Sequence, residues 1–261
     1  RAFLPQDFPV AAAGSEAWVF VQADCAPDQN IDEVEWVLGL ATDGAPVIGI
    51  VAGVQLENSH TRQDVLNELA RHPSVTGVRR LLQDEEAGFA LTRDHLDGVG
   101  AAGQHGFVVD LCVRHTQIPE ITEMVFDHRD VEFVLDHLGK PPVGEGWSSR
   151  WASDLARLAT APNVRCKLSG LTSEAPAGTG AAVFVPWLRH ALDVFGADRC
   201  LFGGDWPVST LTTTYEAWVD IVLRALHEHG ASDADSRAVL ETNAIRCYSS
   251  DSRLARAGGS C

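Results

Sequence analysis

The chain of 261 residues has few cysteines, few basic residues and no long apolar run, and each shortage excludes a class of protein. Its six cysteines form no C-x-x-C pair, which argues against a disulfide scaffold and a zinc knuckle. Twenty lysines and arginines stand against 36 aspartates and glutamates, for a net charge of −16. We therefore expect no nucleic-acid partner, because such proteins need a basic face. The longest apolar stretch, 47–54, is far shorter than the roughly 20 residues of a membrane helix.

The remaining composition is typical of a globular protein, with 45% hydrophobic and 21% charged residues. The first residues do not resemble a signal peptide, so the sequence favours a cytoplasmic protein with reduced thiols and no membrane partner. No Pro/Ser-rich linker or change of composition divides the chain. We predict one domain over residues 1–248, followed by a flexible C-terminal tail over 249–261.

Short runs rich in β-branched residues recur along the chain and predict seven strands. These runs are 17–23, 47–56, 75–82, 107–113, 131–137, 164–169 and 199–204. Apolar residues with helical spacing lie between several of them and predict helices at 30–40, 61–71, 149–160 and 213–229. Alternation of strands and helices at this spacing is typical of a parallel α/β protein.

The number of strands bears on the architecture, because a closed (β/α)₈ barrel needs eight. Residues 1–15 read as a loop and a short helix ending at Gly14, and in a barrel that helix should follow a strand. We predict a TIM-like (β/α)₈ barrel in which the first strand is missing from this chain and lies upstream of Arg1. A barrel that is open or has seven strands is the alternative.

Two predicted strands end in residues suited to catalysis. The strand 131–137 ends in Asp-His, the strand 199–204 runs into Asp205, and glycine and proline interrupt the chain nearby. The C-terminal ends of the strands hold the active site of an α/β barrel. A polar strand end bonded into a loop would explain either residue alone, but two in matched positions favour a site. His137 and Asp205 are therefore a candidate electrophile and general base, or two metal ligands.

Three stretches of the sequence resemble a known family. LDHLGKPP (135–142), CKLSGL (166–171) and FGGDWPV (202–208) are similar to the sugar-lactone hydrolase branch of the amidohydrolase superfamily. This branch includes L-fuconolactone and L-rhamnonolactone hydrolases and the related pyrone-dicarboxylate lactonases. Weaker agreement, in FLPQDF, VFVQAD and GVRRLLQDE among other segments, extends the resemblance over nearly the whole chain. The resemblance implies a (β/α)₈ barrel and a lactonase, a carboxylic ester hydrolase, of carbohydrate metabolism.

The resemblance also implies roles for particular residues. His137 matches the active-site histidine at the end of the sixth strand, and Asp205 matches the aspartate of the eighth, which takes a proton from the attacking water. Arg79 matches a fourth-strand arginine near a polar or anionic substrate group. Lys167 and Ser169 match positions on the seventh strand of the family. The candidate substrate-binding residues are Arg79, Arg80, Lys140, Lys167, Ser169 and Trp206.

From these residues we predict general-base hydrolysis of a small lactone. Asp205 would activate water, while His137 and Arg79 would polarise the ring carbonyl and stabilise the oxyanion that develops in the transition state. Whether a divalent metal such as zinc joins His137 and Asp205 is open, because no cofactor is certain from the sequence. Assembly into a homo-oligomer is open as well.

Two other functions stay open at this point. One barrel supports many chemistries, so a metal-dependent decarboxylase or amide hydrolase is an alternative. The other is a truncated, catalytically silent barrel that binds a sugar acid, since the strand-one His-x-His of the family is absent from these 261 residues. The first alternative predicts bound metal and activity on other substrates, and the second predicts no turnover.

Overall fold

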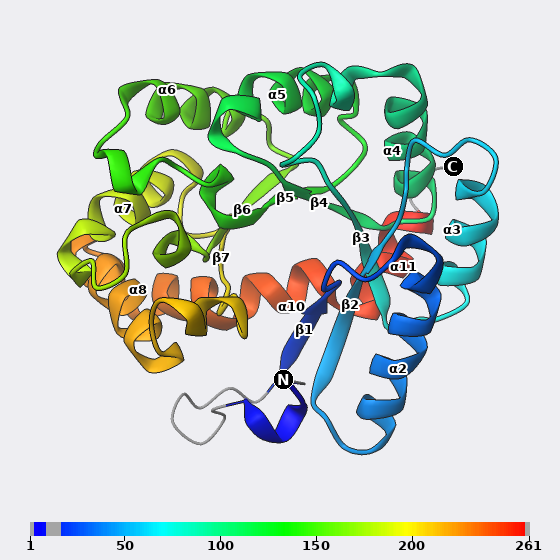
Figure 1. Ribbon diagram of the computed structural model, residues 1–261, viewed down its shortest axis with the longest axis horizontal. Helices are drawn as coiled ribbons and strands as arrows, with labels where there is room; N and C mark the ends of the chain where they lie inside the picture. Colours follow the sequence, from blue (N-terminus) through cyan, green and yellow to red (C-terminus); the bar gives the residue numbers. More distant parts are fainter. Residues whose placement is uncertain (1–2, 9–16, 259–261) are drawn as a thin grey trace. The chain divides into compact units, whose positions relative to one another are not determined.

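Strands and helices alternate along the chain in the computed structural model, which describes residues 3–8 and 17–258 (Figure 1). The strands are β1 (Trp18–Val21), β2 (Val47–Gly53), β3 (Val75–Leu81), β4 (Val108–Cys112), β5 (Phe133–Leu135), β6 (Val164–Leu168) and β7 (Cys200–Phe202). Each lies within one of the predicted β-branched runs. The prediction of an α/β protein is therefore confirmed.

The helices fill the segments between the strands. They are α2 (Asn30–Thr42), α3 (Arg62–Ala70), α4 (Arg93–Gln104), α5 (Ile118–Asp127), α6 (Ser149–Leu158), α7 (Val185–Phe195), α8 (Tyr215–His229), α9 (Asp233–Arg237), α10 (Asn243–Tyr248) and α11 (Ser250–Gly258). The four predicted helices correspond to α2, α3, α6 and α8. Helix α6 begins where the Ser148 hydroxyl accepts a hydrogen bond from the backbone N–H of Trp151, and α8 begins at a threonine that caps it in the same way.

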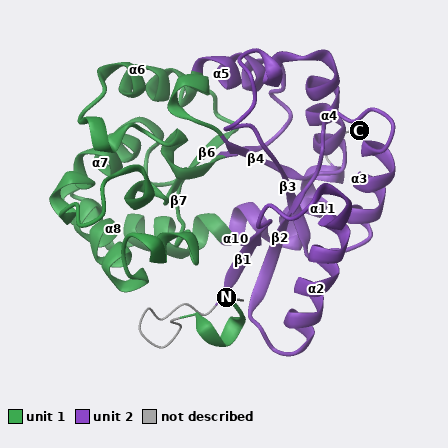
Figure 2. Cartoon of the chain, viewed as in Figure 1, with its two compact units in different colours: residues 1–16, 113–118, 135–244 green, residues 17–112, 119–134, 245–261 purple. Residues whose placement is uncertain are grey.

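The described residues form two compact units (Figure 2). The β1–β4 unit contains residues 17–112, 119–134 and 245–258, and the β6–β7 unit contains residues 3–8, 113–118 and 135–244. The chain enters the β6–β7 unit for residues 113–118 and enters it again within β5.

In the β1–β4 unit, each strand pairs in parallel with the next strand of the chain. Gly77 of β3, for example, lies between Val51 of β2 and Val108 of β4. All three are buried, as expected for parallel strands covered on both faces. A buried hydrogen bond of 2.8 Å from the hydroxyl of Tyr248 to Oδ1 of Asp110 fixes α10 to β4.

In the β6–β7 unit, β6 and β7 are parallel, and Cys166 faces Cys200 across the pair. Both thiols are fully buried, and burial raises the pKa of each well above its ordinary value. The side-chain amide of Asn243 donates to the backbone oxygens of Ala197 and Cys200, at 2.7 and 2.8 Å. This amide therefore holds the start of β7 against the C-terminal helices of the unit.

The C-terminal segment differs from the flexible tail expected over 249–261. Residues 250–258 form α11, in which Arg253 is 5% exposed and donates to the backbone oxygen of Ala70 at 3.1 Å. Arg256 donates to the oxygen of Gly106 at 2.9 Å. The described part of this segment is therefore a helix packed on the β1–β4 unit. The single domain over 1–248 stays a prediction.

The described residues contain seven strands, whereas a closed (β/α)₈ barrel needs eight. The closed barrel and a strand upstream of Arg1 therefore stay predictions. The short helix predicted to end at Gly14 falls in residues 9–16, outside the part of the chain that the structure describes. Over the described ranges, no helix has both the length and the apolar composition needed to cross a membrane.

Candidate active site

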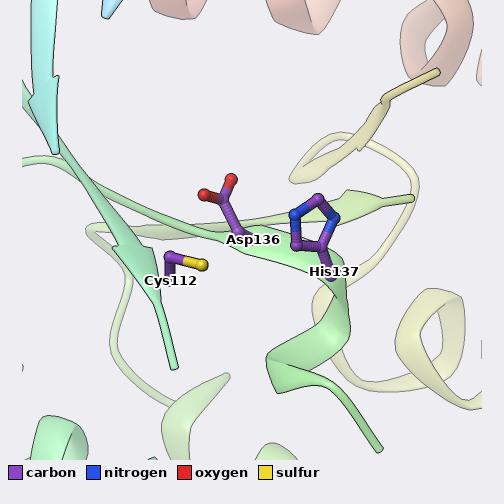
Figure 3. Close-up of side chains that lie close together, drawn as sticks. All are labelled: Cys112, Asp136 and His137. Atoms are coloured by element: carbon purple, nitrogen blue, oxygen red, sulfur yellow. The ribbon is translucent and has the colours of Figure 1, made fainter. Parts of the chain in front are cut away.

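The chain turns sharply where β5 ends, in a short helical turn over Asp136–Gly139 (η5). His137 and Leu138 both have φ of 54°, in the left-handed region that side chains other than glycine avoid. Such a conformation persists only where the surrounding structure holds it. Here Leu138 is buried, and its backbone oxygen accepts a hydrogen bond of 2.9 Å from the indole of Trp151. The anchored turn presents Asp136 and His137 side by side at the strand end (Figure 3).

The two nitrogens of the His137 ring face different residues. Nδ1 lies 2.8 Å from Oγ of Ser169, which follows β6 and is 1% exposed. Nε2 lies 3.8 Å from Oδ1 of Asp205, and the side chains of His137 and Asp205 are each 15% exposed. Gly170 allows this arrangement, because a Cβ atom there would overlap the His137 ring. The ring is therefore fixed on one side and remains partly open to solvent beside a carboxylate.

Asp205 occupies an equally constrained position after β7. Its φ is 50°, again left-handed, and its backbone oxygen accepts a hydrogen bond of 2.8 Å from the N–H of Ser209. Gly203 lies so close to β6 that a Cβ atom there would be 2.8 Å from Cβ of Ser169. Unfavourable backbone at both His137 and Asp205 is the kind of strain that clusters at functional sites.

Lys167 and Asp136 form an ion pair beside this site, with Nζ 2.8 Å from Oδ1. Asp136 is 1% exposed and Lys167 is buried. A buried carboxylate is costly unless it is paired, so the ammonium of Lys167 stabilises the charge next to His137. We missed this role of Asp136 from the sequence, although the Asp-His pair was visible there. Substrate binding by Lys167 and Ser169 stays a prediction.

Two other predicted substrate-binding residues of the same unit have contacts of their own. The indole of Trp206 packs edge-on against Phe3 and Phe8, with ring centroids 5.5 and 5.2 Å apart. These phenylalanines bracket the FLPQDF motif. The backbone oxygen of Lys140 lies 3.1 Å from Nδ1 of His115. Contacts of Trp206 and Lys140 with a substrate stay predictions.

Arg79 lies at the end of β3 in the β1–β4 unit. Its guanidinium donates to the backbone oxygen of Gln22, just after β1, at 2.7 Å. Arg79 also lines a cavity of about 100 Å³, together with Cys25 and Asn30. The Glu33 carboxyl accepts from the N–H of Ala23 nearby, and burial raises its pKa although the charge of Arg79 lowers it. The predicted role of Arg79 in substrate binding is untested.

Arg80, the next residue, is engaged with carboxylates. Its Nε lies 3.0 and 3.1 Å from the two carboxylate oxygens of Glu57, and its Nη2 pairs with Glu85. The guanidinium also lies over the ring of Phe89, 5.2 Å from the centroid. Its contact with substrate stays a prediction. Of the predicted site residues, the structure brings His137, Ser169 and Asp205 together within one unit.

Comparisons with known proteins agree over most of the chain. Residues 1–249 match the family model described as amidohydrolase. The chain is 32% identical over 257 residues to the L-fucono-1,5-lactonase of Burkholderia ambifaria, covering 96% of this chain and 87% of the relative. It is 34% identical over 241 residues to the L-fucono-1,5-lactonase of Burkholderia multivorans, covering 85% and 80%. A crystal structure of an amidohydrolase from Burkholderia multivorans with bound zinc matches with a TM-score of 0.82 and 32% identity, covering 92% and 85%.

Proposed function

The chain belongs to the amidohydrolase family, and from this premise we propose that it is a lactonase that opens the ring ester of a sugar-derived acid. Its 32% and 34% identity to two L-fucono-1,5-lactonases supports this substrate class. The observation that carries the proposal is the approach of His137 Nε2 and Asp205 Oδ1 to 3.8 Å. A general base and a proton donor beside it are the groups that ester hydrolysis needs. With such a substrate, the reaction belongs to carbohydrate metabolism.

Asp205 is the general base of this mechanism. The separation of 3.8 Å between Nε2 and Oδ1 is longer than a direct hydrogen bond. The Asp205 carboxylate can then accept a hydrogen bond from a water molecule beside it. The carboxylate of Asp205 takes a proton from this water as its oxygen attacks the carbonyl carbon of the lactone.

His137 stabilises the negative charge that develops on the carbonyl oxygen. When the Ser169 hydroxyl donates to Nδ1, the ring proton resides on Nε2. The Nε2–H group then donates to the oxyanion, where a fixed donor acts most strongly in the transition state. Ser169 therefore holds the ring in place, and its hydroxyl can donate to Nδ1 while Nε2 keeps the proton.

The same two side chains suit a divalent metal. His137 Nε2 and Asp205 Oδ1, 3.8 Å apart, would hold such an ion, because imidazole nitrogens and carboxylate oxygens are zinc ligands. A zinc ion bound there would polarise the lactone carbonyl and acidify a water molecule. Metal binding needs the lone pair of Nε2, so the ring proton would move to Nδ1 and Ser169 Oγ would accept it. The amidohydrolase from Burkholderia multivorans solved with bound zinc supports zinc as the metal. A cytoplasmic location and a homo-oligomer stay predictions.

The test replaces the general base. Asp205→Asn should lower kcat on aldono-1,5-lactones by about 100-fold to 10,000-fold, the usual contribution of a general base. Asp220→Asn is the matched control, because Asp220 is an exposed aspartate on α8 of the same unit. Lactone hydrolysis at the wild-type rate by Asp205→Asn would show that the mechanism is wrong. No lactone turnover by the wild-type protein would refute the proposed function itself.

A further inference from the structure

Glu174 carries a carboxyl group that has no role in the proposed mechanism, and it lies in the same unit as the proposed base, Asp205. It ends a short helical turn, Leu171–Glu174 (η7), which follows β6. This turn packs against Val208–Leu211 (η9), just after Asp205, and against Val143–Glu145 (η6). Glu174 is half-buried, and its side chain makes no hydrogen bond or ion pair within residues 3–8 and 17–258. A half-buried carboxyl without a protein partner can interact with a bound molecule.

The charges around Glu174 oppose one another. Burial is the largest influence and raises the pKa of the carboxyl above its usual value, and the charge of Asp205 raises it further. Three basic side chains of the same unit lower it: Lys140, Arg114 and His115. Of the turns packed against η7, η6 contributes the exposed Glu145, and η9 contains no titratable residue. Glu174 therefore keeps a proton more readily than an exposed glutamate does.

Opening a lactone requires two proton transfers, and Asp205 accounts for the first. The second proton goes to the ring oxygen, which would otherwise leave as a strongly basic alkoxide. Two neighbouring carboxyl groups in different environments commonly divide acid and base roles in this way. Glu174 is half-buried, and the turn that it ends packs against η9, just after Asp205.

We propose that Glu174 is the general acid that protonates the ring oxygen of the lactone, an inference that rests on the proposed lactonase function. Water adds to the carbonyl carbon and gives one proton to Asp205. The bond between the carbonyl carbon and the ring oxygen then breaks, its electron pair stays on that oxygen, and the Glu174 carboxyl supplies the proton. Exchange with solvent returns the proton from Asp205 and restores the one on Glu174. The product acid ionises in solution.

The test compares two leaving groups in otherwise matched substrates. An aldono-1,5-lactone expels an alkoxide, whereas its 5-thio analogue expels a thiolate, which is much less basic and does not need protonation. With the lactone, Glu174→Gln should lower kcat by about 100-fold or more, and Glu174→Asp should restore part of the rate. With the thiolactone, Glu174→Gln should lower kcat by less than about a tenth of that factor.

The pH profile supplies a second readout. A general acid must be protonated, so the kcat/KM of the wild-type enzyme on the lactone should fall at high pH as Glu174 ionises. Glu174→Gln should lose this high-pH decline, because the glutamine side chain does not ionise. Glu145→Gln is the matched control, because it removes an exposed carboxylate from the adjoining turn. Glu145→Gln should leave kcat on both substrates and the pH profile of kcat/KM unchanged.

Several outcomes would overturn the assignment. These are a wild-type rate for Glu174→Gln, an equal loss on the two substrates, and a change in KM alone. An equal loss of kcat would also follow if Glu174→Gln were misfolded, so the thermal midpoint of each variant is measured. Glu174→Asp then decides between the two explanations. If Glu174→Asp loses no more kcat on the lactone than on the thiolactone, the proposal is refuted. If Asp205→Asn is inactive while Glu174→Gln is fully active, this inference fails and the lactonase function stands.

Discussion

His95 makes the stability of the protein depend on pH in a predictable way. It lies on α4 and is 1% exposed, and its Nδ1 has no hydrogen-bond partner among the described residues. Burial lowers the pKa of His95 from 6.5 to about 4, and the charges of Arg80 and His128 act in the same direction. His95 is therefore neutral in the folded protein wherever the pH is well above 4.

The sign and size of the effect follow from proton linkage. The unfolded chain binds a proton at His95 below about pH 6.5, whereas the folded protein binds it only below about pH 4. Protonation therefore favours the unfolded state between these values, and stability falls as the pH decreases through this window. At about 1.4 kcal/mol for each pH unit, the loss from this group approaches roughly 3 kcal/mol at pH 4.

The assay is urea unfolding at pH values from 7.5 to 4, followed by circular dichroism. Because His95→Leu removes the titrating group, the wild-type protein should lose roughly 3 kcal/mol more free energy of unfolding over this range than the variant does. Acidic residues that titrate in the same window affect both proteins and cancel in the comparison. His60→Leu, at an exposed histidine, is the control and should follow the wild type. Equal losses in wild type and His95→Leu would refute the reasoning.

Two further substitutions test the packing of each unit. Gly170→Ala should lower kcat, measured by steady-state kinetics, by about 100-fold, because a Cβ at φ 69° overlaps the His137 ring. Gly178→Ala is the control. Gly178 also has a left-handed backbone but open space around it, so this variant should leave kcat unchanged. Tyr248→Phe should lower the free energy of unfolding by about 1.5–3 kcal/mol, because it removes the buried bond to Asp110; a wild-type urea midpoint would contradict this.

The sequence alone predicted the seven strands, four of the helices and the family. The seven β-branched runs all contain strands, because strand formation depends on local patterns of apolar and branched side chains. The resemblance in LDHLGKPP and FGGDWPV to amidohydrolases is confirmed by the family match over residues 1–249. His137 and Asp205 were predicted as site residues because a parallel strand has a defined C-terminal end, and a reactive residue there is visible in the sequence; the structure places their side chains 3.8 Å apart.

The charge partners were decided only by the tertiary structure. Lys167 pairs with Asp136 across two strand ends, and Arg80 pairs with Glu57 from a separate loop. The sequence does not reveal where these carboxylates lie, and substrate binding by Lys167 and Arg80 stays a prediction. Glu174, whose carboxyl has no hydrogen-bond or ion-pair partner among the described residues, was not predicted for the same reason, because its environment consists of residues from other parts of the chain.

Helix α11 shows the same division between local and distant information. The sequence predicted a flexible tail over 249–261, whereas residues 250–258 form α11. The helix is held instead by Arg253 and Arg256, whose guanidinium groups bond to the backbone oxygens of Ala70 and Gly106. The position of a strand or helix depends on the pattern of apolar and polar side chains among neighbouring residues, and this pattern can be read directly from the sequence. A hydrogen-bond or ion-pair partner far along the chain is set only when folding brings the two groups together.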